Sequence, residues 1–242
     1  MMRKLVIVIL WLAVRGITVQ PLFAQQLSTP VKITNTEHMN FAPGGAIRID
    51  DSYGELNVEG WDQPEVEITV IKTSPYDYNQ SEATKHVNGV QVMTKRMSDS
   101  ELVISTTLET YDGLLSSTAK TKGDVWIEYQ IHAPHDTKLV IHHGKGTVHL
   151  TDISADIEVT GSRGDVVMML RDLGSYSIDA KTDFGTVVTD HPGNTHRTFF
   201  LIGRTFNTGK TAGSHRIYAR MGYGGITVKT LQQEAYGPRA GN

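Results

Sequence analysis

Five of the ten histidines lie close together in the sequence, and imidazole is a common zinc ligand. They are His132, His135, His142, His143 and His149. Zinc needs three or four ligands that converge on one point. On an extended strand His142 and His143 point to opposite faces, so they cannot chelate one ion together. His143 and His149 flank a glycine turn, and His132 and His135 flank Pro134, so these pairs could approach one another. The alternative, solvated side chains on the outer faces of strands, is favoured, and we expect no metal site and no cofactor.

Carboxylates are the second candidate for chemistry, because a glycosidase uses two of them about 5 to 10 Å apart. Seven aspartates recur near predicted turns: Asp152, Asp156, Asp165, Asp172, Asp179, Asp183 and Asp190. Aspartates at turns more often accept hydrogen bonds from their own backbone. The sequence gives no reason to choose a pair, and no Gly-x-Ser-x-Gly phrase for a serine nucleophile is present. We therefore expect no catalytic residues and no enzyme activity.

Two further groups could mediate binding. Arg163-Gly164-Asp165 spells the tripeptide that integrins recognise, but Gly164 also belongs to the repeat described next, which explains its presence without a receptor. Three aromatic residues precede repeat glycines by one or two positions: Tyr53, Phe184 and Tyr223. We expect them to stack as an aromatic ladder along the repeats. An exposed row of such rings would instead suit stacking on sugar rings.

The elements that carry these residues are short strands led by glycine. Between residues 141 and 190 one phrase recurs, with glycine followed by alternating apolar positions, at Gly146, Gly164 and Gly185. Looser copies begin at Gly54, Gly89, Gly123 and Gly225. Period-2 alternation predicts strands with one buried face, and glycine permits a tight turn with positive φ. Self-similarity at roughly 20 residues predicts units that each stack on the next.

The same alternation predicts strands outside this window. We expect them at residues 46–50, 55–59, 65–72, 90–94, 101–107, 125–131, 138–142, 217–220 and 225–231, with one or two helical turns over 81–87 and a weaker repeat over 191–214. The predicted fold class is all-β: a β-solenoid, a single-stranded right-handed β-helix-like stack of glycine-led strands. A meander of hairpins remains the alternative. A solenoid pairs residues about 20 apart in parallel, whereas hairpins pair near neighbours antiparallel.

The chain divides into four parts. Residues 1–24 have the features of an export signal, with Arg3 and Lys4 before ten apolar residues and Ala24 at the expected cleavage point. Residues 25–42 are expected to form a linker or edge segment, 43–231 the β-repeat domain, and 232–242 a flexible tail. Ten apolar residues are too few to cross a bilayer, which needs roughly 20, so we expect no stable transmembrane segment in the mature form.

Composition narrows the classes of partner. The chain has no cysteine, which removes disulfides and thiolate metal sites. Three of its 23 basic residues lie in the leader, so the mature chain has 20 basic and 26 acidic residues, a net charge of −6. A mildly acidic chain lacks the basic surface of a nucleic-acid binder, so we expect no nucleic-acid partner.

Residues 125–189 combine a Val/Trp/Ile/Tyr strand, the step "IHAPHDTKLVI" and the glycine-led repeats, and "GWDQPEVEITV" and "PGGAIRIDDSYGELNVEG" precede them. Together, over residues 43–230, they resemble the bacterial putative-adhesin domain family of unknown function, exported repeat proteins related to the head domains of auto-transporter adhesins. The resemblance implies a β-solenoid or β-helix-like fold, an envelope location and no established catalytic residues.

Three functions remain open at this point. The favoured hypothesis is an exported, non-enzymatic module that binds a glycan, a peptide or another envelope protein, in the periplasm or outside the cell. The second is a carbohydrate-active enzyme on the same scaffold, which would need carboxylates that meet in one groove. The third is a sensor of envelope damage that binds cationic peptides through its negative charge.

Overall fold

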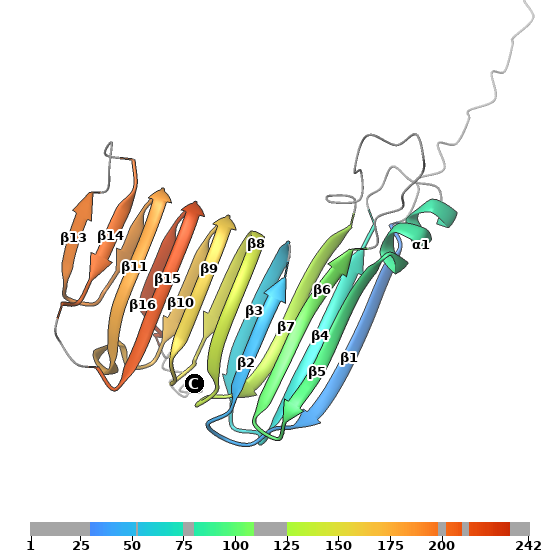
Figure 1. Cartoon of the computed structure of the whole chain (residues 1–242), viewed down its shortest axis with the longest axis horizontal. Helices are drawn as coiled ribbons and strands as arrows, with labels where there is room; N and C mark the ends of the chain where they lie inside the picture. Colours follow the sequence, from blue (N-terminus) through green and yellow to red (C-terminus); the bar gives the residue numbers. More distant parts are fainter. Residues whose placement is uncertain are drawn as a thin grey trace, which may run out of the picture.

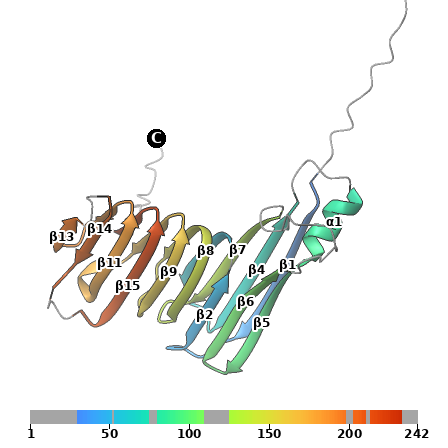
Figure 2. The same cartoon turned by 45° about the horizontal axis from the view of Figure 1, so that its top comes forward.

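The computed structural model describes residues 30–51, 53–74, 80–108, 125–197, 202–209 and 213–232. These residues form a mostly β fold with two mixed sheets, one α-helix, α1 (Gln80–Asn88), and one short 3-10 helix, η1 (Leu173–Ser175). The two sheets lie over one another as layers, with α1 at one end (Figures 1 and 2). The expected export signal at 1–24 and nearly all of the expected tail at 232–242 lie outside the described residues.

Strand β8 (Lys138–Thr151) belongs to both sheets, because its first half pairs in one and its second half in the other. Sheet A runs in the order β1 (Lys32–Asn40), β4 (Glu65–Thr73), β7 (Trp126–Pro134), β3 (Gly54–Trp61), β8, β10 (Val166–Leu170), β16 (Ile226–Thr230) and β12 (Val187–Thr189). Sheet B runs in the order β5 (Val90–Ser98), β6 (Glu101–Leu108), β2 (Ala46–Asp51), β8, β9 (Ile157–Arg163), β15 (His215–Tyr223), β11 (Tyr176–Phe184), β14 (Arg204–Asn207) and β13 (Asn194–Arg197).

The centre of the molecule is a stack of five coils, where a coil is a sheet-B strand that turns at a corner into a sheet-A strand. In spatial order the coils are β2–β3, β8, β9–β10, β15–β16 and β11–β12, and neighbouring coils pair in parallel. Antiparallel strands lie at both ends: β1 and β4 beside β7, β5 beside β6, and β14 and β13 beside β11. Both pairing patterns considered from the sequence therefore occur in one molecule.

The expected order of stacking, each unit on the next, is wrong at the C-terminal end. Coils β8 and β9–β10 stack at the expected spacing, with residues 18 positions apart in register, as in Leu139↔Ile157. The last coil, β15–β16, lies between β9–β10 and β11–β12, so that Ile217 pairs with both Ile157 and Ile178. Hydrogen bonding between strands does not depend on sequence separation, so the glycine spacing alone cannot fix the order of the coils.

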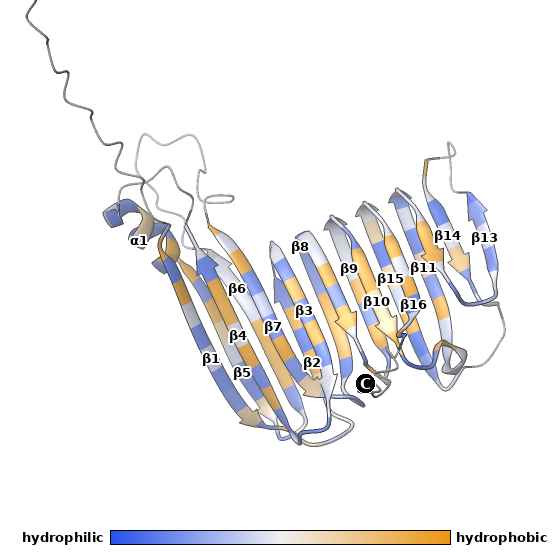
Figure 3. Ribbon diagram, turned by 180° about the vertical axis from the view of Figure 1, so that it is seen from behind, coloured by the Kyte–Doolittle hydropathy of each residue, from blue (hydrophilic) through white to orange (hydrophobic). Residues whose placement is uncertain are grey.

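Alternation along the strands gives the core its rows of aliphatic side chains (Figure 3). One row in sheet B joins Ile47, Leu139, Ile157, Ile217 and Ile178, all at most 2% exposed. The matching row in sheet A joins Leu56, Val148, Val166 and Ile226, all at most 1% exposed. Each fully buried side chain of this size contributes roughly 1.5–3 kcal/mol, so stacking supplies the burial that one coil lacks.

Five glycines form a column at the corner between the sheets, and we call them the ladder glycines. In spatial order they are Gly54, Gly146, Gly164, Gly224 and Gly185, with φ between 126° and 156°. A Cβ on Gly164 would lie 1.7 Å from the carbonyl oxygen of Gly146, and a Cβ on Gly224 would lie 1.7 Å from that of Gly164. The positive φ predicted for Gly146, Gly164 and Gly185 is confirmed. The last copy uses Gly224 rather than Gly225, and Gly89 has no positive φ.

Other expected elements differ in detail. The weaker repeat predicted over residues 191–214 is wrong, because β13 and β14 pair antiparallel as a hairpin at the end of sheet B. The helical turns predicted over 81–87 are confirmed as α1. Strand β1, within the segment expected to be a linker or edge, pairs with β4 along its whole length. No helix among the described residues has the length and apolarity that a bilayer crossing requires.

Candidate binding surfaces

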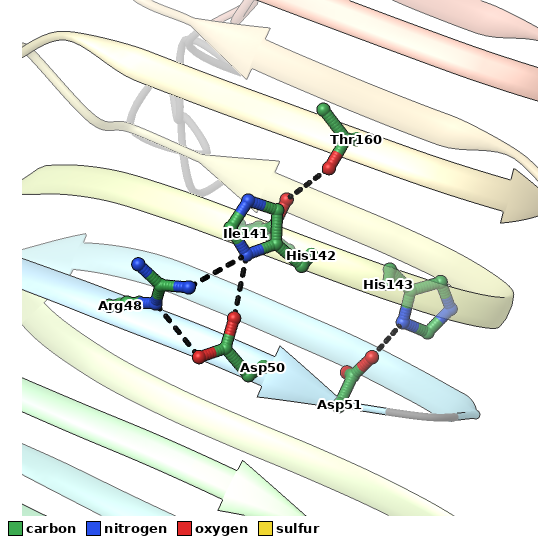
Figure 4. Close-up of polar contacts among 7 residues, drawn as sticks. All are labelled: Arg48, Asp50, Asp51, Ile141, His142, His143 and Thr160. Atoms are coloured by element: carbon green, nitrogen blue, oxygen red, sulfur yellow. Dashed lines mark hydrogen bonds and ion pairs between the residues drawn. The ribbon is translucent and has the colours of Figure 1, made fainter.

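The outer face of sheet B carries two adjacent rows of side chains, all of them polar except Val140. The first row contains Arg48, Val140, Glu158, Tyr218 and Asp179, and the second contains Asp50, His142, Thr160, Arg220 and Lys181. Figure 4 shows one end of this face, where Arg48 and His142 flank Asp50. The Arg48 Nε donates to Asp50 Oδ2 at 2.8 Å, and His142 Nδ1 lies 2.6 Å from Asp50 Oδ1. Because Asp50 contacts both Arg48 and His142, the three side chains hold one another in place at this end of the face.

Ionisation of Asp50 reflects a balance between burial and hydrogen bonding. Partial burial raises its pKa, but hydrogen bonds from Arg48 and His142 and the nearby positive charge outweigh this effect. The net result is a pKa below the ordinary value, so the group is ionised at neutral pH. The hydrogen bond to Asp50 and its negative charge raise the pKa of Arg48.

A shallow groove lies further along the same face, over β9 between β8 and β15. Its volume is about 360 Å³, and its polar walls are Lys138, Asp156, Glu158, Arg216 and Tyr218. The guanidinium carbons of Arg216 and Arg220 lie 5.2 and 4.0 Å from the centroid of the Tyr218 ring. Arg220 is itself held by Asp179, with Nη2 2.8 Å from Oδ2. The groove therefore offers an oriented aromatic ring beside groups that donate and accept hydrogen bonds.

The aromatic residues singled out from the sequence separate into two environments. Phe184 and Tyr223 stack with ring centroids 4.5 Å apart and an interplanar angle of 5°. Both are exposed, at 43% and 50%. Tyr53 is only 9% exposed and lies at the other end of the coil stack, so the expected ladder of three rings is wrong. The exposed pair is the arrangement that we associated with binding rather than with packing.

The Arg163-Gly164-Asp165 tripeptide is built into the corner. Gly164 is a ladder glycine, and Asp165 Oδ1 accepts a hydrogen bond from the backbone N–H of Gly225 at 2.7 Å. The Arg163 guanidinium lies 5.6 Å from the Tyr223 ring centroid. Backbone geometry and capping therefore account for the glycine and the aspartate.

The outer face of sheet A carries an alternating row of histidines and glutamates over four neighbouring strands. His38, Glu67, His132 and Glu59 are successive cross-strand partners. His132 Nδ1 lies 3.1 Å from Glu67 Oε1, and its ring stacks on Trp61 at 5.2 Å. A shallow groove of about 340 Å³ adjoins this row and reaches His149. The histidines of this row are therefore already in contact with its glutamates.

One histidine points inward, where it forms a buried pair with a carboxylate. His143 Nδ1 lies 2.5 Å from Asp51 Oδ1, and the two side chains are 0% and 1% exposed (Figure 4). Strand alternation predicted that His142 and His143 would lie on opposite faces, and this is confirmed, because His142 is 39% exposed. Tyr129, also inside the core, has its pKa raised by burial. The cluster is enclosed by the two sheets, so the buried pair is sealed off from solvent.

The five clustered histidines have separate partners. His132 contacts Glu67 and Glu59, His135 contacts Asp62 and Asp152, and His149 contacts Glu55. His143 is buried whereas His149 is 41% exposed, so these two do not meet, and His132 lines the same groove as His149 without forming a ligand cluster with it among the described residues. No three histidine or carboxylate side chains converge as a metal site within the described ranges.

The aspartates considered as catalytic carboxylates are also engaged separately. Asp156, Asp165 and Asp172 each accept a backbone N–H, from Arg216, Gly225 and Gly174 respectively. Asp152, Asp179 and Asp183 form ion pairs with Arg171, Arg220 and Lys181. Asp190 lies at the edge of sheet A, where its N–H donates to the Val228 carbonyl. The expectation that a turn aspartate bonds its own local backbone is confirmed for Asp172, whereas Asp156 and Asp165 bond the backbone of a neighbouring coil.

Sequence reasoning missed the groove on sheet B. The sequence feature that indicates this groove is Arg216-x-Tyr218-x-Arg220, three large polar residues at alternate positions of a strand. Such alternation places all three side chains on the outer face. Their combination with Lys138 and Glu158 depends on β15 lying beside β9, which the order along the chain does not indicate.

Comparisons with known proteins return a similar fold but no named family. No protein-family model matches the chain, and no curated protein matches it. The crystal structure of a putative cell adhesion protein from Clostridium sporogenes ATCC 15579 superposes with a TM-score of 0.50 at 14% identity, covering 84% of this chain and 100% of that one. A putative adhesin from Parabacteroides merdae ATCC 43184 gives a TM-score of 0.27 at 12% identity, covering 64% of this chain and 63% of that one. The first likeness shows a shared fold, and no comparison shows the expected relation to auto-transporter adhesins.

Proposed function

We propose that this protein is an exported, non-enzymatic binding module with an adhesin-like role, and that the groove on sheet B binds a glycan. The five coils would form a short β-solenoid within one domain over residues 43–231, after removal of the leader at 1–24. The cell-adhesion name of the Clostridium sporogenes protein with the same fold supports this proposal.

The observation that carries the glycan assignment is the environment of Tyr218. Its ring lies in an open groove, and its orientation is fixed by Arg216 and Arg220. Sugar rings present apolar C–H faces that pack on aromatic rings, and hydroxyl groups that pair with charged donors and acceptors. Glu158 and Lys138 supply an acceptor and a donor beside the ring. A flat, partly apolar and hydroxyl-rich ligand matches this combination.

The groove favours binding over hydrolysis. A glycosidase needs one protonated and one ionised carboxyl group across the scissile bond. Of the two groove carboxylates, Asp156 is committed to the backbone N–H of Arg216 at 2.9 Å. Its role is to join β9 to β15, so Glu158 is the one carboxylate of the groove left to contact a ligand.

The test is a screen of the purified protein against immobilised neutral and acidic glycans, followed by titration of the best ligand. We expect Tyr218→Ala to weaken binding about tenfold or more, as removal of a central aromatic contact does. Trp126→Ala is the matched control, because Trp126 is an exposed aromatic residue (57%) in sheet A, and this variant should bind normally. Equal losses in both variants, or turnover of the glycan, would contradict the proposal.

A further inference from the structure

Four coils place one side chain each at the same point of the corner, immediately before a ladder glycine. These residues are Lys145, Arg163, Tyr223 and Phe184, and we call them the corner row. They are successive cross-strand partners: Lys145 with Arg163, Arg163 with Tyr223, and Tyr223 with Phe184. The ends of β9, β15 and β11, which carry three of them, lie side by side along one edge of the fold (Figure 1). Parallel strands are about 4.8 Å apart, so the row spans roughly 14 Å.

Three side chains of the corner row, Arg163, Tyr223 and Phe184, form a stack. Phe184 and Tyr223 lie face to face at 4.5 Å, and the Arg163 guanidinium covers the other side of the Tyr223 ring at 5.6 Å. All four residues are largely exposed or half-exposed. The glycine that follows each residue has a positive φ, which fixes the direction in which the preceding side chain leaves the corner. The row is therefore ordered before any ligand binds.

The two cations of the row have no carboxylate partner within ion-pair distance among the described residues. Two acidic residues flank the row in sequence, Asp165 after Arg163-Gly164 and Asp183 before Phe184, and both are already used, since Asp165 caps Gly225 and Asp183 pairs with Lys181. Two adjacent uncompensated positive charges are unusual in a chain whose net charge is −3. They give this edge a local positive potential, which attracts an anionic ligand.

We propose that the corner row binds an acidic polysaccharide built from uronic acid units, extended along the row. The sugar units of an extended chain advance by about the same distance as neighbouring strands, so successive units face successive coils. Carboxylates would pair with Lys145 and Arg163, and a sugar C–H face would pack on the side of the Phe184 ring that faces away from Tyr223, with Tyr223 supporting Phe184 from behind. A single-stranded nucleic acid fits less well, because each successive base needs a free aromatic face and Tyr223 is covered by Phe184 and Arg163.

The proposal can be tested by titrating the full chain with a hexagalacturonate, in low and moderate salt. We expect the double variant Lys145→Gln/Arg163→Gln to bind about tenfold more weakly and to lose most of the salt dependence. Tyr223→Ala should also weaken binding while leaving the salt dependence in place. The double variant Lys95→Gln/Lys229→Gln removes two exposed charges elsewhere and should bind as the wild type does.

Three results would overturn the proposal: no binding by the folded wild type, equal losses in the two double variants, or equally tight binding of a neutral hexasaccharide or single-stranded DNA. Circular dichroism of each variant excludes misfolding as the cause. Lys145→Gln/Arg163→Gln should keep its affinity for the glycan whose binding Tyr218→Ala weakens, because the groove on sheet B is a separate site. The two proposals can therefore fail independently.

Discussion

The ladder glycines make a quantitative prediction for Gly164→Ala. The new Cβ would lie 1.7 Å from the Gly146 carbonyl oxygen and 2.6 Å from its carbon, both backbone atoms that cannot rotate away. Carbon–oxygen contacts in sheets are normally about 3.3 Å, so the two coils would have to separate locally by roughly 1.6 Å. In addition, φ is 126°, a value that a residue with a Cβ rarely adopts.

The expected loss follows from these two effects. Backbone strain of this kind costs about 1–3 kcal/mol. Separation of the coils weakens nearby backbone hydrogen bonds, such as Val148 N–H to Asp165 O and Val166 N–H to Gly225 O, each worth about 1 kcal/mol. Together the substitution should lower the free energy of unfolding by about 3–5 kcal/mol, a large part of the total for a typical domain.

Gly209→Ala is the matched control. Gly209 also has a positive φ, 75°, but a Cβ there would have nothing within 4 Å. We expect this variant to lose only about 1–2 kcal/mol, the ordinary penalty of the left-handed region. The assay is equilibrium denaturation in urea, with the slope compared among variants to verify that the same transition is measured. If Gly164→Ala were no less stable than Gly209→Ala, the close approach of the coils would be refuted.

Three further substitutions test the polar contacts. Asp51→Ala leaves His143 buried without its partner and should lower the free energy of unfolding, measured by urea denaturation, by about 3–5 kcal/mol. The double variant Asp51→Leu/His143→Leu should recover much of that loss. A loss below about 1 kcal/mol in the single variant would argue against a buried pair. Asp50→Asn should cost under about 1 kcal/mol at pH 7, because the carboxylate is over a third exposed. The pKa of Asp50 is lower in the folded protein than in the unfolded chain, where it is about 3.9. The ionised carboxylate therefore stabilises the fold above the unfolded-state pKa, and this stabilisation disappears as the pH falls through the folded-state pKa. The free energies of unfolding of wild type and Asp50→Asn should converge in acid. Asp165→Ala removes the cap on Gly225 and should cost about 1 kcal/mol in the same assay, and the wild-type protein should not compete with an Arg-Gly-Asp peptide for integrin in a binding assay.

Local features of the sequence predicted local features of the structure well. Alternation located most strands, because a strand in a two-layer fold buries every second side chain, as in Leu139 and Ile141. Glycine predicted the corners at Gly146, Gly164 and Gly185, because only glycine adopts the required φ without strain. The opposite orientations of His142 and His143 followed from the same alternation.

The arrangement of the coils could not be read in this way. The pairing of Ile217 with Ile157 joins residues 60 positions apart, and no local pattern distinguishes it from pairing with a nearer coil. The groove around Tyr218 and the stack of Arg163, Tyr223 and Phe184 both depend on this pairing. Sequence reasoning therefore identified Tyr223 and Phe184 as candidates without predicting that they would be neighbours.

The buried Asp51–His143 pair was also outside what the sequence showed. The aspartate ends β2 and the histidine lies in β8, 92 residues later, so the pair exists only because these strands are parallel neighbours. Ionisable groups that face inward together can indicate an active site. Here both side chains are at most 1% exposed, so no substrate can reach them, and a structural role at the corner follows.

Both proposed binding surfaces require that β15 lies between β9 and β11, so this position is the central structural claim. Engineered disulfides test it most directly. The chain has no cysteine, so introduced pairs have no competitors. Arg220 is the register partner of both Thr160 and Lys181, which are themselves two strands apart. A disulfide spans Cα atoms about 4.4–6.8 Å apart, compared with about 4.8 Å for neighbouring strands and twice that for the next. Thr160→Cys/Arg220→Cys should therefore oxidise to an intramolecular disulfide, detected by mass spectrometry, whereas Thr160→Cys/Lys181→Cys should not. The reverse result would show that β11 rather than β15 lies beside β9, so that the coils stack in sequence order, and would contradict the account.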